Sequence, residues 1–402
     1  MKRQESRVKR QIVLLTLALA ATSGVATATD YDWLSGTGDW TDTGWTTNGI
    51  VVTPAWDASS VGIIHSGTQN LTPTANPGTQ INEVRVKPGA GTANLNISGD
   101  LSLAGRLQIG SDSSDSGSVT VTQTDGAVTL AGSAFVGQYG SGANTYHLNG
   151  GSLNSYRLYV AANDTASATV NIGGGAISLS DSLHVGQGVD NTGELNLSSG
   201  SLQVTADWAY IGVSGTGALN QTGGALSLQR VGIGYYSGSD GTVSVSGGSF
   251  TASNYIYGRY GDSLFVVDGS GATEIEVNAV IFNNDSDTLR FNLDAGGSTR
   301  MDASGDYNGL GINLQNSTVE IDAIAGFNGT VGSTYDLMWT ASGFDTTGLT
   351  LSNLCGTEFD WDIVSKDGGE VFQVTVIPEP GTLGLVVAMG GGLLFIRRKF
   401  MI

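Results

Sequence analysis

Four charged residues in the middle of the chain have the types and spacing of a carboxylate pair flanked by bases. Arg157, Asp181, Asp207 and Arg230 recur about every 25 residues, each shortly before a short apolar run. Glycoside hydrolysis needs two carboxyl groups about 5 to 10 Å apart, and matching points of stacked strands lie about 4.8 Å apart. The two acids stand six and seven residues after their reference glycines, so their register differs. Surface charges that pair along a strand ladder are the simpler interpretation.

Other residues with chemical potential are few and scattered. His65, His147 and His184 lie far apart in the sequence, and the last two fall on outward positions of different runs. Cys355 is the only cysteine, so it makes no internal disulfide, and no histidine stands near it in the sequence. We therefore predict no catalytic residues and no zinc or cofactor site.

Three turns rich in aspartate could coordinate Ca²⁺ through oxygen ligands. They span residues 111–116, 190–191 and 283–287. None follows the Gly-Gly-x-Gly-x-Asp pattern of calcium-binding β-helix repeats. The signal for calcium is weak, and we expect these turns to be solvated.

Composition limits the class of protein further. The 402 residues include 61 Gly and only 6 Pro, with 13% charged residues, which favours many short strands and tight turns. The net charge is −19, and the span 29–396 holds only nine of the 17 Lys and Arg against 35 of the 36 acids. This strongly acidic span argues against nucleic-acid binding, which requires a basic surface.

A repeat of about 25 residues fills the middle of the chain. A glycine follows an alternating apolar pair at spacings of 27, 24, 25, 25, 24 and 24 residues. These glycines are Gly99, Gly126, Gly150, Gly175, Gly200, Gly224 and Gly248. Glycines at such corners allow the positive φ angles of sharp turns.

Each repeat contains three short runs in which apolar and polar residues alternate. Alternate side chains of a strand share a face, so six apolar side chains of a repeat should point to one interior. The Ser, Thr, Asn and Gln between them should face water. The inward sets of two repeats are Leu95, Ile97, Leu101, Leu103, Leu107 and Ile109, and Val170, Ile172, Ile177, Leu179, Leu183 and Val185.

One such repeat cannot enclose a core, so repeats must stack as coils. The pattern predicts an all-β fold, a parallel β-helix (β-solenoid) of about seven to eight coils. Trp33, Trp40 and Trp45 precede the array, and we favour a hydrophobic cap over a sugar-stacking platform for them, because the end of a solenoid must be covered.

The N-terminus has the layout of a secretory signal peptide. Basic residues precede the apolar run 12–21, and small residues lead to a cleavage position after Ala28. We therefore expect the protein to be exported.

The C-terminus carries Pro378, Glu379 and Pro380, then 16 uncharged residues at 381–396, then Arg397, Arg398 and Lys399. A helix over 381–396 would be about 24 Å long, short of the roughly 30 Å hydrocarbon core. The basic cluster should stay cytoplasmic, which places the large N-terminal part outside the inner membrane. A single short transmembrane helix is predicted here, with a plain membrane anchor as the alternative.

These three parts, in this order, resemble the PEP-CTERM sorting signal. The resemblance covers about the last 25 residues. It implies recognition by an exosortase, a membrane transpeptidase-like cysteine protease that removes the tail near the Pro-Glu-Pro motif. It also implies a Gram-negative bacterium that makes exopolysaccharide, and a transient stay in the inner membrane before the cell surface or extracellular matrix is reached.

The repeats are similar to those of autotransporter passengers and PEP-CTERM proteins. The shared features are turns of the Gly-Gly-Ser-Leu type, as at 150–153, and a Val-Gly or Ile-Gly close, as at 185–186. The third repeat departs with Val160-Ala161, and the last, near 280–282, lacks the glycine.

We divide the chain into five segments. They are a signal peptide at 1–28, an N-terminal β cap at 29–90, solenoid repeats at 91–282, a C-terminal β segment at 283–377 and a sorting signal at 378–402. The expected function is a non-enzymatic structural or adhesion protein of the cell surface or biofilm exopolysaccharide matrix. Its expected partners are the secretion machinery, the exosortase and an exopolysaccharide. The alternative is a secreted β-helix that binds or degrades polysaccharide.

Overall fold

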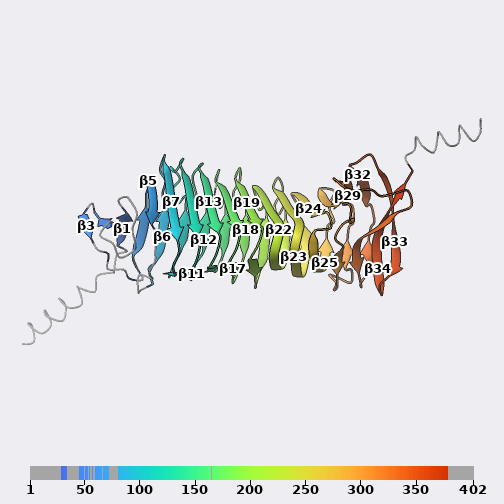
Figure 1. Cartoon of the computed structure of the whole chain (residues 1–402), viewed down its shortest axis with the longest axis horizontal. Helices are drawn as coiled ribbons and strands as arrows, with labels where there is room; N and C mark the ends of the chain where they lie inside the picture. The colour runs from blue at the N-terminus through green and yellow to red at the C-terminus, as the bar shows by residue number, and fades with distance from the viewer. Residues whose placement is uncertain are drawn as a thin grey trace, which may run out of the picture.

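The computed structural model shows an elongated, three-sided prism of stacked β coils (Figure 1). It describes residues 29–33, 45–48, 50–52, 54, 57, 59–65, 67–71, 80–163 and 165–378. Ala28, Trp40, Glu379, Pro380 and the predicted C-terminal helix with Arg397, Arg398 and Lys399 lie outside these ranges. Within them every regular element is a strand, and no helix there is long and apolar enough to cross a membrane.

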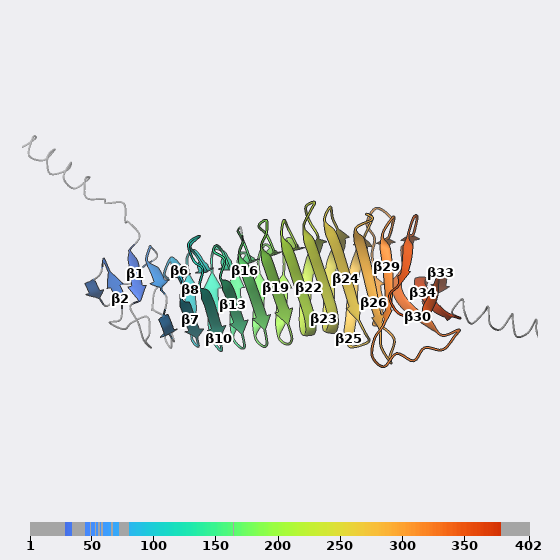
Figure 2. The same ribbon diagram turned by 90° about the horizontal axis from the view of Figure 1, so that it is seen from above.

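Parallel pairing between successive coils builds three faces that run along the rod. A residue pairs with the one about 24 to 27 positions later, as in Leu95 with Val121 and Val170 with Leu195. The coils succeed one another like the turns of a spring in the view from above (Figure 2). The architecture is therefore an all-β parallel solenoid.

The first face pairs strands at the start of each coil. It comprises β5 (Gly67–Leu71), β7 (Thr92–Ile97), β10 (Ser118–Gln123), β13 (Ala143–Leu148), β16 (Ser167–Ile172), β19 (Thr192–Leu197), the first parts of β22 (Thr216–Ile233) and β23 (Asp240–Gly258), β24 (Asp262–Asp268), β26 (Asp287–Leu293), β29 (Thr318–Ala323) and β32 (Thr350–Asn353).

The second face follows the glycine corner of each coil. It comprises β8 (Leu101–Leu103), β11 (Ala127–Leu130), β14 (Ser152–Ser155), β17 (Ala176–Leu179), β20 (Ser201–Val204), the middle of β22 and β23, the first part of β25 (Ala272–Ile281), β27 (Met301–Ala303) and β30 (Thr334–Thr340).

The third face closes each coil. It comprises β1 (Asp30–Trp33), β4 (Val61–Ile64), β6 (Glu83–Val86), β9 (Leu107–Ile109), β12 (Ala134–Val136), β15 (Leu158–Val160), β18 (Leu183–Val185), β21 (Trp208–Ile211), the ends of β22, β23 and β25, β28 (Ile312–Asn313) and β31 (Phe344–Asp345).

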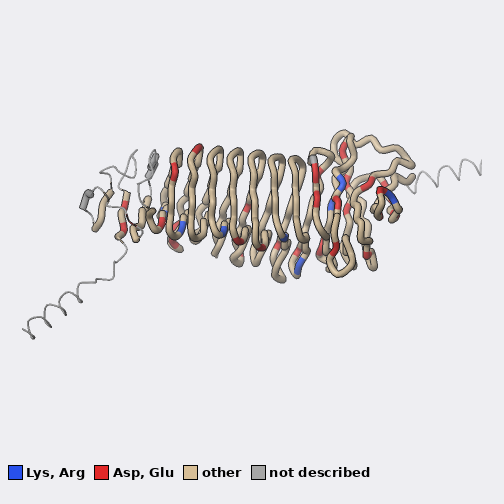
Figure 3. Tube along the Cα trace, turned by 90° about the horizontal axis from the view of Figure 1, so that it is seen from below, with Lys and Arg blue, Asp and Glu red and all other residues tan. Residues whose placement is uncertain are grey.

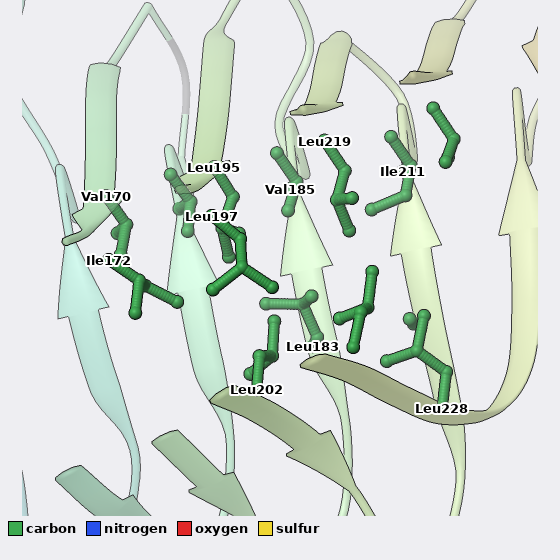
Figure 4. Close-up of a cluster of buried hydrophobic side chains, with 14 of the residues drawn as sticks. Val170, Ile172, Leu183, Val185, Leu195, Leu197, Leu202, Ile211, Leu219 and Leu228 are labelled. Atoms are coloured by element: carbon green, nitrogen blue, oxygen red, sulfur yellow. The ribbon is translucent and has the colours of Figure 1, made fainter. Parts of the chain in front are cut away.

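The core is a set of apolar columns inside the prism, as the alternating pattern predicts. All twelve inward residues named for the two repeats are buried. Branched side chains of successive coils lie above one another in these columns, for example Val170 with Leu195 and Ile172 with Leu197 (Figure 4). Burial of each such side chain contributes roughly 1.5 to 3 kcal/mol before ordering costs.

Two inward positions carry glutamine, against the expectation that every glutamine of a run faces water. Gln123 ends β10 inside the prism, where its Nε2 donates to the carbonyls of Gly126 and Ser152 at 2.9 and 3.0 Å. Its Oε1 accepts a hydrogen bond from the buried Tyr146 hydroxyl. Gln221 donates in the same way to the Ser249 carbonyl at 2.8 Å. These amides satisfy carbonyls that the corner turns leave inside, which offsets the cost of burying them.

The stack has about nine turns, more than the seven to eight predicted. Parallel pairing continues beyond residue 282, through β26 with β29 and β29 with β32, although the glycine signature is lost there. Leu289, Phe291 and Leu293 keep the inward alternation of β26 and are buried. Stacking of the strands requires this alternation, whereas the glycine at the corner is not required where the loops between strands are longer.

Both ends of the core are covered. Trp33 and Trp45 are buried and meet edge to face at 5.1 Å, which confirms the cap interpretation for these two residues. β1 and β3 (Ile50–Val52) flank β2 (Trp45–Thr47) in antiparallel pairing.

At the other end β33 (Glu358–Lys366) and β34 (Gly369–Ile377) form a hairpin, and β34 pairs antiparallel with β30. Phe359, Phe372 and Val374 of this hairpin are buried against the last coils.

Most corner glycines adopt the predicted positive φ. Gly126, Gly175, Gly200, Gly224 and Gly248 do so, with φ between 68° and 78°. In the third repeat the residue with positive φ is Gly151, so the predicted Gly150 was wrong by one position. The closing position keeps a left-handed φ of 58° at Ala161, where the sequence departs from glycine.

Contact between coils makes the corner glycines sensitive to substitution. A Cβ on Gly200 would lie 2.3 Å from the Gly175 carbonyl oxygen, whereas a Cβ on Gly238 meets no atom within 4 Å, although φ is +78° and +84° respectively. We expect Gly238→Ala to cost about 1 to 2 kcal/mol through backbone strain. Gly200→Ala should cost a further 1 to 3 kcal/mol or so, because stacked coils must move apart. Urea unfolding of both variants measures the difference; equal losses would contradict tight corner stacking.

Candidate functional site: an aromatic and arginine face

A row of rings stands on the outside of the third face. Phe135, Tyr159, His184 and Tyr210 each occupy the outward centre of their strand, in β12, β15, β18 and β21. They are direct neighbours across the parallel ladder. The sequence produces this row by placing a ring between two inward apolar residues, once per coil. We call these four residues the aromatic row.

The row is stacked at the spacing of the coils. Phe135 and Tyr159 have centroids 4.7 Å apart with an interplanar angle of 6°. Tyr159 and His184 follow at 4.7 Å, and His184 and Tyr210 at 4.9 Å. The backbone ladder therefore holds the rings at a stacking distance, and each pair adds about 0.5 to 1.5 kcal/mol beyond its buried area.

One coil beyond Tyr210 the column contains Gly232, and larger side chains cover the gap. A Cβ on Gly232 would lie 3.2 Å from the Trp208 ring and 3.4 Å from the Tyr235 ring. Trp208 also stacks on Tyr210 at 5.5 Å. A glycine at this point thus lets an indole and a phenol lie over the backbone and widen the aromatic surface.

Arg259 completes this surface. Its guanidinium carbon lies 4.6 Å from the Tyr257 ring centroid, 4.7 Å from Tyr235, 5.5 Å from Trp208 and 5.8 Å from Tyr260. We call these five residues the arginine cluster. Distances below about 6 Å to a ring face allow cation–π attraction, worth about 0.5 to 2 kcal/mol.

A hollow of about 290 Å³ opens beside the cluster. Its walls come from three successive coils and carry both aromatic faces and polar groups. The lining residues are His184, Gln187, Tyr210, Val213, Ser214, Tyr235 and Tyr236.

The predicted charged column forms two separate ion pairs beside the aromatic row. Arg157 pairs with Asp181, and Arg230 pairs with Asp207 at 3.5 Å. Asp181 is partly buried, which favours its neutral form, but hydrogen bonds from Arg157 and Ser182 prevail and hold its pKa below the ordinary value. A general acid needs a raised pKa, so this carboxyl does not fit that role. The four residues are therefore charges that pair between neighbouring coils, which is the interpretation favoured from the sequence.

The histidines serve three different places. His65 bonds to Asp32 at 2.8 Å near the N-terminal end, and His147 lies on the first face within 3.4 Å of the Asn171 amide. His184 accepts or donates a 3.0 Å bond with the Ser182 hydroxyl. Burial, then the charge of Arg157, lowers the pKa of His184 to about 4, so it is neutral at pH 7.

Cys355 is half-buried, and its thiol lies 3.5 Å from the Thr357 carbonyl. Over the described ranges, no three His, Cys, Asp or Glu side chains are grouped closely enough to hold a metal ion.

One aspartate in each of two predicted turns is buried, whereas Asp190 of the third turn is exposed, as predicted. Asp115 is buried and accepts the backbone N–H groups of Gly89 and Asp112. Asp287 is fully buried, and its Oδ2 accepts the backbone N–H groups of Asn283 and Asn284 at 3.0 and 3.1 Å. These carboxylates satisfy turn donors that would otherwise be orphaned inside the coil stack.

Asp287 gives the fold a measurable pH dependence. Burial raises its pKa to about 6, against about 3.9 in the unfolded chain. The folded state therefore holds this proton more tightly, and the associated stability is present below about pH 4 and lost as pH rises through about 6. We expect a loss on the order of 2 to 3 kcal/mol in denaturant unfolding.

In Asp287→Asn this step should be absent. The exposed Asp285→Asn in the same turn is the matched control and should keep it. An unchanged pH profile in Asp287→Asn would contradict the assignment.

The sequence analysis did not identify the aromatic row, although a signal was present. A ring at the centre of three of the closing runs (135, 159 and 210), with His184 between, was available from the repeat alignment. The cluster around Arg259 was beyond that signal, since its rings come from strand centres, strand starts and corner loops.

Comparison with known proteins adds no relative. The sequence matches no protein-family model, and no curated protein is significantly similar to it.

Proposed function

We propose that the chain is an exported, non-enzymatic structural and adhesive protein of the cell surface or biofilm matrix of a Gram-negative bacterium. An N-terminal signal peptide ending at Ala28 directs its export. Exosortase then processes it at Pro378, Glu379 and Pro380, after a transient stay in the inner membrane through the short helix and its basic end.

The observation that supports this proposal best is the uninterrupted stack of coils (Figure 1). The described chain begins at one end of the rod and ends at the other. β34 ends at Ile377, so the chain leaves the folded body directly before the Pro378 motif. At about 4.8 Å between paired strands, the twelve described strands stacked on the first face span roughly 53 Å. A body joined to its tail at one end would hold the long polar faces away from the membrane.

Polysaccharide binding is a second candidate function, and the aromatic row favours it. The stacked rings cover one another's faces and present their edges as an apolar strip along the rod, on which the C–H faces of sugar rings can lie. The flanking ion pairs offer polar groups for sugar hydroxyls. A scaffold of the exopolysaccharide matrix would use such a surface, so this candidate is compatible with the first.

The sorting step predicts a specific change in mass and location. In a host with exosortase, the wild-type protein should leave the inner membrane without its tail. Replacement of Pro378, Glu379 and Pro380 by alanine should leave a full-length chain in the membrane fraction. Intact mass spectrometry of fractionated cells measures both outcomes, with Thr382→Ala as the neighbouring control that should process normally. Full-length wild-type protein in the inner membrane would refute sorting and leave a plain anchor.

A further inference from the structure

Arg259 is exceptional among the cations of this acidic protein. The structure describes nine of the 17 Lys and Arg residues, and eight of these lie within 4.0 Å of a carboxylate oxygen. In the described ranges Arg259 alone has no acid at that distance. The eight paired residues are Arg85, Lys87, Arg106, Arg157, Arg230, Arg290, Arg300 and Lys366.

Most hydrogen-bonding capacity of this guanidinium is unused. Its Nη2 donates a long bond of 3.4 Å to the Tyr235 hydroxyl, and its Nε has no hydrogen-bond partner. A guanidinium carries five N–H donors, so four have no acceptor in the described part of the chain. The Nε–H among them is buried, so the Nη groups are the ones a ligand can reach. A half-buried cation with free donors is a receptor for a carboxylate or another oxyanion.

The setting of Arg259 selects what can carry that anion. Tyr236 and Tyr260 beside it are 54% and 66% exposed, and the hollow lined by Tyr210 and Tyr235 is adjacent. An isolated inorganic ion would use none of this aromatic surface. Sugar rings would use it, since their C–H faces pack on aromatic rings and their hydroxyls bond to polar groups such as Ser214.

The number of unpaired cations limits how closely the charges of the ligand can be spaced. Cations of the coils lie mostly along one side of the rod with acids beside them (Figure 3), and every other described cation is paired with an acid. A polyanion with a charge on each unit, such as a nucleic acid, needs several free cations. A chain with widely spaced acidic groups needs one.

We propose that the arginine cluster and the adjoining hollow bind an acidic polysaccharide whose charged sugars alternate with neutral ones. One carboxylate pairs with Arg259, and neighbouring sugars lie on Tyr235, Tyr236 and Tyr210 along the rod axis. The inference names the ligand class of the matrix role proposed above and rests on it for its biological setting, whereas the binding itself does not require export.

The test is titration calorimetry of the purified full-length chain with a hyaluronan octasaccharide, in which glucuronate alternates with N-acetylglucosamine. The comparison ligand is a neutral chitin oligosaccharide of similar length. Binding of the acidic ligand should be at least about tenfold tighter and should weaken with added salt. Equal affinity for the neutral ligand overturns the role of Arg259. If free glucuronate binds with equal affinity, or an oligothymidylate binds more tightly, the assignment of an acidic polysaccharide as the ligand is overturned.

Arg259→Gln should weaken binding of the acidic octasaccharide about tenfold or more and leave binding of the neutral one unchanged. Arg106→Gln is the matched control, because Arg106 is an exposed, ion-paired arginine beside the same face six coils away. Equal loss in the two variants overturns the proposal. Arg259→Lys keeps the charge over the rings and should recover part of the affinity, which separates binding from any loss of folding in the glutamine variant.

Tyr236→Ala tests the stacking surface. This substitution should weaken binding of the octasaccharide several-fold without affecting binding of free glucuronate. The Tyr139→Ala variant, changed at the equivalent corner four coils away, should bind the octasaccharide normally. Correct sorting without any octasaccharide binding would refute this inference alone, and binding by a chain that stays in the inner membrane would refute the proposed sorting alone.

Discussion

The fixed rise between coils, set by the parallel backbone ladder, governs the rest of the structure. A strand residue inside the stack has a neighbour about 4.8 Å away in the coil before and in the coil after. Inside the prism this rise stacks branched side chains such as Ile172 and Leu197. At the corners it brings carbonyl groups so close that only glycine fits, as at Gly200. A single distance thus decides which residues are tolerated inside and at the corners.

The same rise turns the outer surface into a set of ladders. On the first face, Asn220 donates to Asn196 at 2.9 Å and Asn196 donates to Asn171 at 3.0 Å. On the third face the rise is the stacking distance of aromatic rings, and the aromatic row follows. Charges of opposite sign on neighbouring coils meet as ion pairs for the same reason. When one residue type recurs at the same position of successive coils, the fixed rise therefore brings its side chains into contact with one another.

Local alternation predicted the inward residues and most corner glycines, because both depend on positions within one coil. Features that depend on neighbouring coils were harder to predict. Gln123 has an outward residue type, and only the carbonyls of the next corner explain its burial. Asp287 carries a charge that the sequence places in a turn, and only its bonds to two backbone N–H groups show why it is enclosed. The cluster at Arg259 joins rings from several coils, so no single repeat reveals it.

The hairpin at the C-terminal end has a consequence for self-association. A parallel solenoid offers an unpaired ladder at each end, onto which a second molecule could add strands and grow into a fibril. Here β34 turns antiparallel and β33 becomes the last strand, with no other strand partner in the described ranges. Its free edge displays Asp360 and Asp362 to solvent. In a tail-to-tail encounter a second copy would bring its own Asp360 and Asp362 beside them, so like charges disfavour strand pairing between two copies at this edge.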